Sequence, residues 1–165
     1  MKPPVAACLG LTIFLIGLNL SAMGADSSAT AARAPIYDEK ADGSQQIAVA
    51  LEAAKKENKR VLLQFGANWC IWCHRLHNLC QTNSDISAKL RDAYIVVLID
   101  VNKGHNKEVD IRYDNPTRFG LPALVVLDAD GKALVTEDSG KLEEGDHHDP
   151  KKVLAFLNEW TGKKP

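Results

Sequence analysis

The 165-residue chain lacks several compositional features, and each absence argues against a class of protein or of function. Neither charge is in excess, because 20 lysines and arginines meet 21 aspartates and glutamates, and this balance argues against a nucleic-acid partner. Methionine occurs only as Met1 and Met23, both in the apolar stretch at the start of the chain. The sequence also has no internal repeat, so its length and composition fit one globular domain with a single core.

Charged residues are nearly absent from the first part of the chain. After Lys2 no charged residue occurs before Asp26, and Val5 to Leu20 is almost wholly apolar. Ala22-Met23-Gly24 supplies small residues where a signal peptidase would cut, so the sequence predicts a signal peptide over 1–24 and a protein exported to the periplasm. The alternative is an uncleaved membrane anchor, because the apolar stretch is close to the roughly 20 residues that a membrane span needs.

Cysteine is also scarce, yet two of the four cysteines form the clearest motif in the chain. Val61 to Phe65 is an apolar run typical of a buried strand, and Gly66-Ala67-Asn68 ends it. Apolar residues then recur at helical spacing after Cys70. A strand, a sharp turn and a helix are therefore predicted, with Cys70 at the helix N-terminus. Unpaired backbone N–H groups and the helix dipole favour a thiolate there, which makes Cys70 the predicted nucleophile.

The spacing of the remaining cysteines separates their predicted roles. One helical turn between Cys70 and Cys73 puts their Cα atoms about 5 to 6 Å apart, which suits a disulfide. Cys73 can therefore resolve a mixed disulfide formed at Cys70. Cys80 lies roughly 10 Å further along the same helix, beyond disulfide reach, and is predicted to be a core residue. Cys8 falls in the apolar leader and is given no function.

The rest of the chain predicts a flexible lead-in over 25–43 followed by one domain over 44–162. Helices are expected at 44–58, from Asn83 or Ser84 to Asp92, at 107–113, and after the N-cap Asp149. A buried strand at 94–101 should run parallel to the first strand, and a hairpin is expected around the turn at 128–131. Residues 141–148 are predicted to form a loop.

Three features in order resemble the thioredoxin-like superfamily: Trp69-Cys70-Ile71-Trp72-Cys73 after a strand, Leu121-Pro122 before the hairpin, and the terminal helix. Within the superfamily, residues 66–100 look most similar to exported members, such as the C-terminal domain of the periplasmic transmembrane thiol reductase and small secreted disulfide isomerase-like proteins. The resemblance implies an α/β thioredoxin-like fold, a central mixed β-sheet flanked by helices, with Pro122 in the cis form next to the disulfide. It implies a thiol-disulfide oxidoreductase whose redox-active group is the Cys70–Cys73 disulfide. Neither a cofactor nor a metal is expected.

The resemblance also implies a site and its partners. Cys70 and Cys73 would be catalytic, and the substrate groove would be formed by Trp69, Trp72, Leu121 and Pro122. His74, one turn from Cys70, is a candidate for tuning its pKa, although a place on the exposed side of the helix is the simpler interpretation. The expected partners are protein thiols and disulfides and a membrane or periplasmic redox protein that resets the pair.

Two departures from thioredoxin limit what can be transferred. Thioredoxin has a buried acidic residue six positions before its first cysteine, where this chain has Gln64, which cannot act as a base. The residues between the cysteines are Ile71-Trp72 instead of Gly-Pro, and this dipeptide strongly affects redox potential. The direction of electron flow therefore stays open.

Other chemistries fit parts of the pattern less well. Cys70, Cys73 and His74 match the C-x-x-C-H signature of haem c, but without a methionine after the leader the second axial ligand would have to be another histidine. A zinc site at Cys73, His77 and Cys80 would need ligands whose positions along a helix differ by roughly 10 Å.

Two further alternatives concern a surface loop and the whole domain. His147-His148 among acidic residues could hold a surface metal, but a solvated loop is the preferred interpretation. A binding or chaperone-like module that keeps the fold without exchanging electrons is the non-enzymatic alternative, and the intact second cysteine argues against it.

Overall fold

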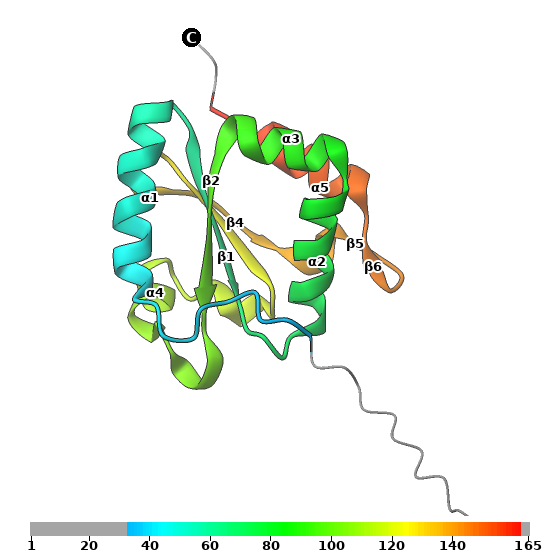
Figure 1. Ribbon diagram of the computed structural model, residues 1–165, viewed down its shortest axis with the longest axis horizontal. Coiled ribbons are helices and arrows are strands. Elements are labelled where there is room, and N and C mark those ends of the chain that lie inside the picture. Colours follow the sequence, from blue (N-terminus) through cyan, green and yellow to red (C-terminus); the bar gives the residue numbers. More distant parts are fainter. Residues whose placement is uncertain (1–32, 163–165) are drawn as a thin grey trace, which may run out of the picture. The chain divides into compact units, whose positions relative to one another are not determined.

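A four-stranded mixed sheet with helices on both faces forms the part of the chain, residues 33–162, that the computed structural model describes (Figure 1). The strand order is β2 (Tyr94–Asp100), β1 (Arg60–Gly66), β3 (Ala123–Leu127) and β4 (Ala133–Asp138). β1 and β2 are parallel, whereas β3 runs antiparallel to both β1 and β4. The expected thioredoxin-like α/β fold is confirmed, including the parallel strand pair and the hairpin.

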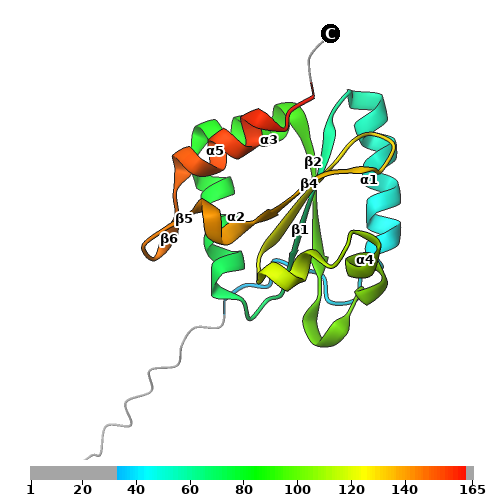
Figure 2. The ribbon, with the colours of Figure 1, turned by 180° about the vertical axis from the view of Figure 1, so that it is seen from behind.

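Among the described residues, α-helices cover both faces of the sheet (Figure 2). α1 (Gly43–Glu57) and α4 (Lys107–Arg112) pack on one face, and α2 (Ile71–Thr82), α3 (Ser84–Ala93) and α5 (Pro150–Glu159) pack on the other. Side chains of β1 alternate between these faces. Val61, Leu63 and Phe65 enter the core beneath α1. Gln64 and Gly66 therefore face α2, on the side of the sheet that carries the cysteines.

Polar side chains begin the helices where the sequence predicts caps. The Asn83 side chain accepts hydrogen bonds from the backbone N–H groups of Asp85 and Ile86 at the start of α3. Asp149 does the same for Lys151 and Lys152 at the start of α5. Pro150, the first residue of α5, has no backbone N–H that would need a partner. Both predicted caps are confirmed, because each side chain satisfies N–H groups that the helix leaves unpaired.

Part of the predicted flexible lead-in is instead built into the domain. Residues 36–42, called the strap below, cross the end of the sheet and lead into α1. Tyr37 in the strap is only 3% exposed. The lead-in prediction is therefore wrong for the strap, because a side chain from the β1–α2 turn binds its backbone. The predicted signal peptide and residues 25–32 lie outside the described residues.

The predicted loop at 141–148 is also partly regular. β5 (Glu143–Glu144) and β6 (His147–His148) pair antiparallel around Gly145, whose φ of 63° suits a tight turn. His147 is exposed, as expected of a solvated loop, but His148 is 3% exposed and packs against α2. The loop prediction is wrong because two-residue strands leave almost no periodic signal in a sequence.

Candidate active site

The two cysteines lie where β1 gives way to α2. Cys70 is the N-cap of α2, with extended backbone angles, and its Sγ accepts the backbone N–H of Cys73 at 3.1 Å. A disulfide joins Cys70 to Cys73, and their Cα atoms are 5.3 Å apart, as the one-turn spacing predicts. Cys70 is 5% exposed and Cys73 is fully buried, so a partner can approach only the first sulfur.

The loop before β3 closes the site from the other side. The Leu121–Pro122 bond is cis, as the resemblance implies, and the Leu121 carbonyl oxygen lies 3.6 Å from Cys70 Sγ. The Ser139 hydroxyl donates to the Pro122 carbonyl at 2.5 Å and fixes the loop from the far side. Backbone atoms of this loop therefore border the sulfur that a substrate would reach.

The two tryptophans have different surroundings. Trp69 is 66% exposed, and its indole N–H donates to the Asn102 side chain at 3.1 Å. Trp72 is half-buried, with the His148 ring edge-on at 5.4 Å and the Arg75 guanidinium 4.5 Å from its ring centre. Trp69 thus offers open apolar surface directly beside Cys70, whereas Trp72 is held by its neighbours.

His74 and Cys80 sit on α2 away from the reacting sulfur. His74 Nε2 lies 2.8 Å from the Asn68 carbonyl oxygen and donates to it, so this ring braces the turn before Cys70. Cys80 is a half-buried free thiol at the margin of the core beneath α5. Burial raises the pKa of Cys80 to about 11, which keeps it a thiol at neutral pH.

A model of the thioredoxin-like family matches residues 42–129, slightly more than half of the chain, and this range contains both cysteines and Pro122. The chain belongs to the thioredoxin-like family. The thioredoxin-like chain is similar to the crystal structure of a disulphide isomerase from Xylella fastidiosa Temecula1, with 36% identity and a TM-score of 0.68. That match covers 75% of this chain and 95% of the isomerase.

Two curated relatives are much longer than this thioredoxin-like chain. The thiol:disulfide interchange protein DsbD of Vibrio vulnificus is 26% identical over 128 residues, which are 74% of this chain and 21% of DsbD. Mouse spermatogenesis-associated protein 20 is 37% identical over 51 residues, 31% of this chain and 6% of that protein. The chain thus spans a small part of both relatives.

Tyr37 and Asn68 belong to this thioredoxin-like site, although the sequence did not single them out. The Asn68 Oδ1 accepts the backbone N–H groups of Ile36 and Tyr37, each at 2.9 Å, and its Nδ2 donates to the Tyr37 carbonyl at 3.0 Å. The strap is thereby bound to the turn that precedes Cys70. The available signal was small: Tyr37 is the single aromatic residue in 25–43.

The Tyr37 hydroxyl lies beneath the disulfide in a buried polar cluster. It accepts the side-chain N–H of Gln64 at 2.8 Å. Burial raises the pKa of Tyr37 well above its usual value, the Gln64 hydrogen bond opposes this, and the negative charge of Asp100 raises it further. Tyr37 is therefore a neutral hydroxyl at neutral pH.

Asp100 ends β2 directly beside the end of β1, and sequence reasoning gave it no role. It is 1% exposed, and its Oδ2 lies 3.0 Å from His105 Nδ1 and accepts the backbone N–H of Asn102 at 3.2 Å. Asp100 pairs with Gly66 in the parallel register, so its side chain lies on the α2 face of the sheet. A buried carboxylate thus lies at the end of β2, two positions beyond the residue that pairs with Gln64.

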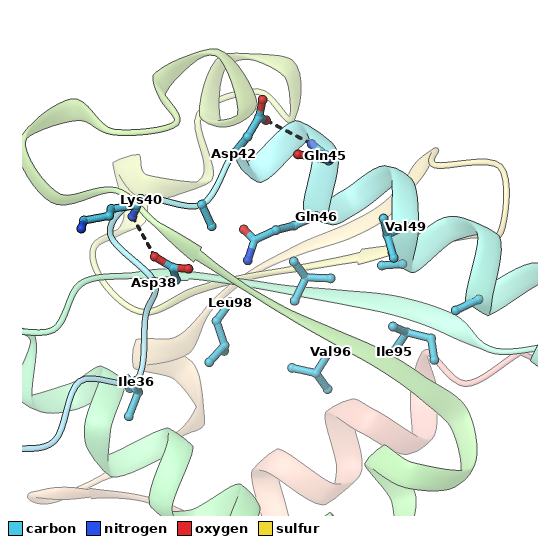
Figure 3. A pocket seen from close by; sticks show the side chains of 14 residues that line it. Ile36, Asp38, Lys40, Asp42, Gln45, Gln46, Val49, Ile95, Val96 and Leu98 are labelled. Atoms are coloured by element: carbon cyan, nitrogen blue, oxygen red, sulfur yellow. Dashed lines mark hydrogen bonds between the residues drawn. The ribbon is translucent and has the colours of Figure 1, made fainter.

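A separate groove of about 810 Å³ lies between α1, the strap and β2, and it contains neither cysteine (Figure 3). Val49, Val96 and Leu98 give it apolar walls, and Asp38, Lys40 and Asp42 lie along the strap.

Within residues 33–162, no helix is both long and apolar enough to span a membrane, and no cluster of three or more potential metal ligands occurs.

Proposed function

We propose that the chain is an exported thiol-disulfide oxidoreductase that reduces or isomerises disulfides of other proteins. The observation that carries this proposal is the place of Cys70 at the N-cap of α2, with a backbone N–H already donated to its sulfur. Such a position stabilises negative charge, so it lowers the pKa of a thiol relative to a free cysteine. The buried Cys73 is kept from solvent until Cys70 has reacted.

The reaction proceeds by two sulfur exchanges. The Cys70 thiolate attacks a substrate disulfide, forms a mixed disulfide, and one substrate sulfur leaves as a thiolate. Cys73 then loses its proton and attacks Cys70 Sγ, which re-forms the protein's own disulfide and releases the second substrate sulfur. Two electrons pass to the substrate. In isomerisation, a substrate thiolate attacks the mixed disulfide in place of Cys73, and no net electrons are transferred.

The substrate groove in this proposal runs between Trp69 and the Leu121-Pro122 loop, with Trp72 beside them. The Leu121 carbonyl 3.6 Å from Cys70 Sγ marks where an extended substrate chain would pass, next to backbone that can pair with it. The exposed indole of Trp69 supplies apolar contact without selecting one side chain. Such a groove suits many unfolded or misfolded protein partners.

Export is the other part of the proposal, and it determines the redox partner. The apolar, charge-free start of the chain with small residues at 22–24 supports cleavage after Gly24. In an oxidising compartment the pair would need a membrane or periplasmic protein to reduce it again. Mass spectrometry of the fractionated protein tests this: we expect a soluble chain that begins at Ala25, whereas an intact chain in the membrane fraction would support the anchor.

Activity is tested on the reduced protein with insulin reduction and with refolding of a scrambled disulfide protein. We expect Cys70→Ser to abolish both activities, and Cys73→Ser to accumulate a mixed disulfide on Cys70 that gel electrophoresis without reductant detects. The rate of Cys70 alkylation should be half-maximal well below the free-cysteine pKa of about 8.5. A wild type without either activity, or a Cys70 that reacts no faster than a simple alkyl thiol at pH 6, refutes the proposal.

A further inference from the structure

The two edges of the four-stranded sheet differ in how well they are protected. β4, at one edge, carries Glu137 and Asp138 and has a register shift against β3. Charges and irregular pairing of this kind keep an edge strand from joining another sheet. β2, at the opposite edge, contains no lysine, no proline and no charged residue before Asp100, and Val96 in its middle is 42% exposed. This outward side of β2, called the β2 edge below, is open to a further strand.

The direction of the backbone groups in β2 alternates along the strand. The N–H of Val101, just after the strand, donates to the Gly66 carbonyl at 2.9 Å. Counting back in steps of two, residues at odd positions bond to β1, whereas Val96 and Leu98 present their N–H and C=O groups outward. Within residues 33–162, no hydrogen bond occupies these outward groups.

The open part of the β2 edge has Val96 at its centre. On one side of it, the Asp100 carbonyl already accepts from the Asn106 side chain at 3.0 Å. On the other side, the Tyr94 N–H is bound by a carbonyl in the last turn of α3, which leaves only the Tyr94 carbonyl free. A strand that pairs with this edge is therefore limited to residues 94–98.

Grooves border β2 on both faces of the sheet. The groove of about 810 Å³ described above lies on the α1 face, with the exposed Val49 in its wall (Figure 3). A second groove of about 420 Å³ lies on the other face, where Val96 and Leu98 meet Leu90 and Arg91 of α3. Side chains of a strand alternate between the two faces of its sheet. A strand paired with β2 would therefore place its side chains in both grooves in turn.

We propose that the β2 edge is an interface between two copies of this chain, paired antiparallel about a two-fold axis at Val96. In an antiparallel pair, residues with outward groups lie opposite one another and exchange hydrogen bonds. Val96 then pairs with Val96 of the second copy, and Leu98 pairs with Tyr94 of the second copy. The free groups have this symmetry, because Tyr94 and Leu98 lie equally far from Val96 and the Tyr94 carbonyl remains free to accept the Leu98 N–H.

The charges along the β2 edge favour a second copy over an unrelated strand. Arg91, in the last turn of α3, is the charged side chain beside the Tyr94 end of the edge. The charged side chains at the other end belong to the strap and are acidic in sum: Asp38, Lys40 and Asp42. The two-fold axis brings the acidic end of each copy to the basic end of the other. It also keeps both α1 helices on one face, where Val49, near the middle of each helix, becomes covered.

This interface leaves both redox sites accessible. β1 lies between β2 and β3, so the β2 edge is on the side of the sheet away from the Leu121-Pro122 loop that precedes β3. Because β1 and β2 are parallel, the two-fold axis directs the Cys70 sites of the two copies to opposite ends of the joined sheet. Thiol exchange should therefore not depend on dimer formation, and the inference stands apart from the proposed function.

Sedimentation velocity tests the proposal on the full chain, expressed with its own leader and purified as the cell processes it. We expect wild type to be a dimer that dissociates on dilution. Val96→Lys places two like charges opposite each other at the axis and should raise the dimer dissociation constant by roughly 100-fold or more. The exposure of Val96 lets the lysine reach solvent in the monomer. Insulin reduction per chain should stay at the wild-type rate.

Ile111→Lys is the matched control. Ile111 is 55% exposed on α4, which leads from the end of β2 across to β3, so the variant adds the same charge at an apolar position outside the interface. It should dimerise as wild type does. Val49→Lys is a second interface variant in case Val96→Lys folds poorly. Val49 is 63% exposed on α1, and its replacement should also raise the dissociation constant.

A charge reversal locates the axis. Val96→Glu alone should also be monomeric, and an equal mixture of Val96→Lys and Val96→Glu should form a mixed dimer, because the unlike side chains meet at the axis. Hydrogen exchange should show protected Val96 and Leu98 amides in the wild-type dimer and unprotected ones in Val96→Lys. The Val97 amide, which is bound to β1, should stay protected in both.

Three results overturn the inference. The first is a wild type that is monomeric at every concentration, and protected Val96 and Leu98 amides in that monomer would show that another segment of the chain covers the edge. The second is a dimer that neither Val96→Lys nor Val49→Lys weakens. The third is a mixture of the two charged Val96 variants that forms no dimer.

Discussion

The strap should depend on one side chain, and replacing that side chain tests how it is held. Asn68 makes four hydrogen bonds to the strap: two from the backbone N–H groups of Ile36 and Tyr37, one to the Tyr37 carbonyl, and one to the Glu39 carboxylate. Asn68→Ala removes all four at once. It leaves the strand, the cysteines and the helix cap of α2 in place.

The expected loss follows from where these bonds lie. A net hydrogen bond contributes about 1 kcal/mol, and a buried backbone group left unpaired costs roughly 1–3 kcal/mol. The bond to exposed Glu39 adds little, and the strap can regain water by detaching, which limits the total. We therefore expect a loss of about 2–4 kcal/mol in the free energy of unfolding. For a domain of this size, this corresponds to a fall in Tm of roughly 10 °C.

Hydrogen exchange measures the effect directly. In wild type the amides of Ile36 and Tyr37 should be protected, and in Asn68→Ala they should exchange much faster while amides of β1 change only with global stability. Asn158→Ala, on the exposed side of α5, is the control and should change stability by less than about 0.5 kcal/mol. If Asn68→Ala cost no more than this control, or if both amides stayed protected, the proposed role of Asn68 would be wrong.

Two other predictions concern groups beside the site. Cys80→Ser should leave the rate of insulin reduction nearly unchanged, and a variant that loses this activity while it keeps its stability would give Cys80 a redox role. Burial lowers the pKa of His148 from 6.5 to about 4. Between these pH values the unfolded chain binds a proton that the native chain does not. The free energy of unfolding therefore decreases, by up to about 3 kcal/mol, as the pH is lowered from 6.5 to about 4. His148→Phe should remove this loss in denaturant titrations at pH 7 and pH 4.5; an unchanged pH dependence would contradict it.

The cysteine unit could be predicted from the sequence because its signals are local. The apolar run, the turn residues and the helical spacing after Cys70 all lie within about twenty positions and point to the same strand, turn and helix. Once a helix is assumed, the three-residue spacing of Cys70 and Cys73 determines the distance between their Cα atoms. Asp149 and Asn83 were found for the same reason, since a helix cap is read from adjacent residues.

The polar cluster beneath the disulfide could not be predicted in this way. Tyr37 is bound through Asn68 and Gln64, which lie 31 and 27 positions away in the chain. The sequence around it, Pro35-Ile36-Tyr37-Asp38-Glu39, shows neither helix nor strand periodicity. Asp100 ends a strand that was predicted correctly, but only the register with β1 shows that it stands beside Gly66. Such contacts depend on tertiary packing.

Gly66 has a consequence for how related sequences should vary. Because a Cβ at this position would overlap the Tyr37 hydroxyl, the tyrosine can be kept only where the glycine is kept. A relative with a side chain at the end of the first strand should therefore carry a smaller residue where this chain has Tyr37. Covariation of these two positions, 29 residues apart, would then distinguish chains that have a strap beneath the disulfide from chains that do not.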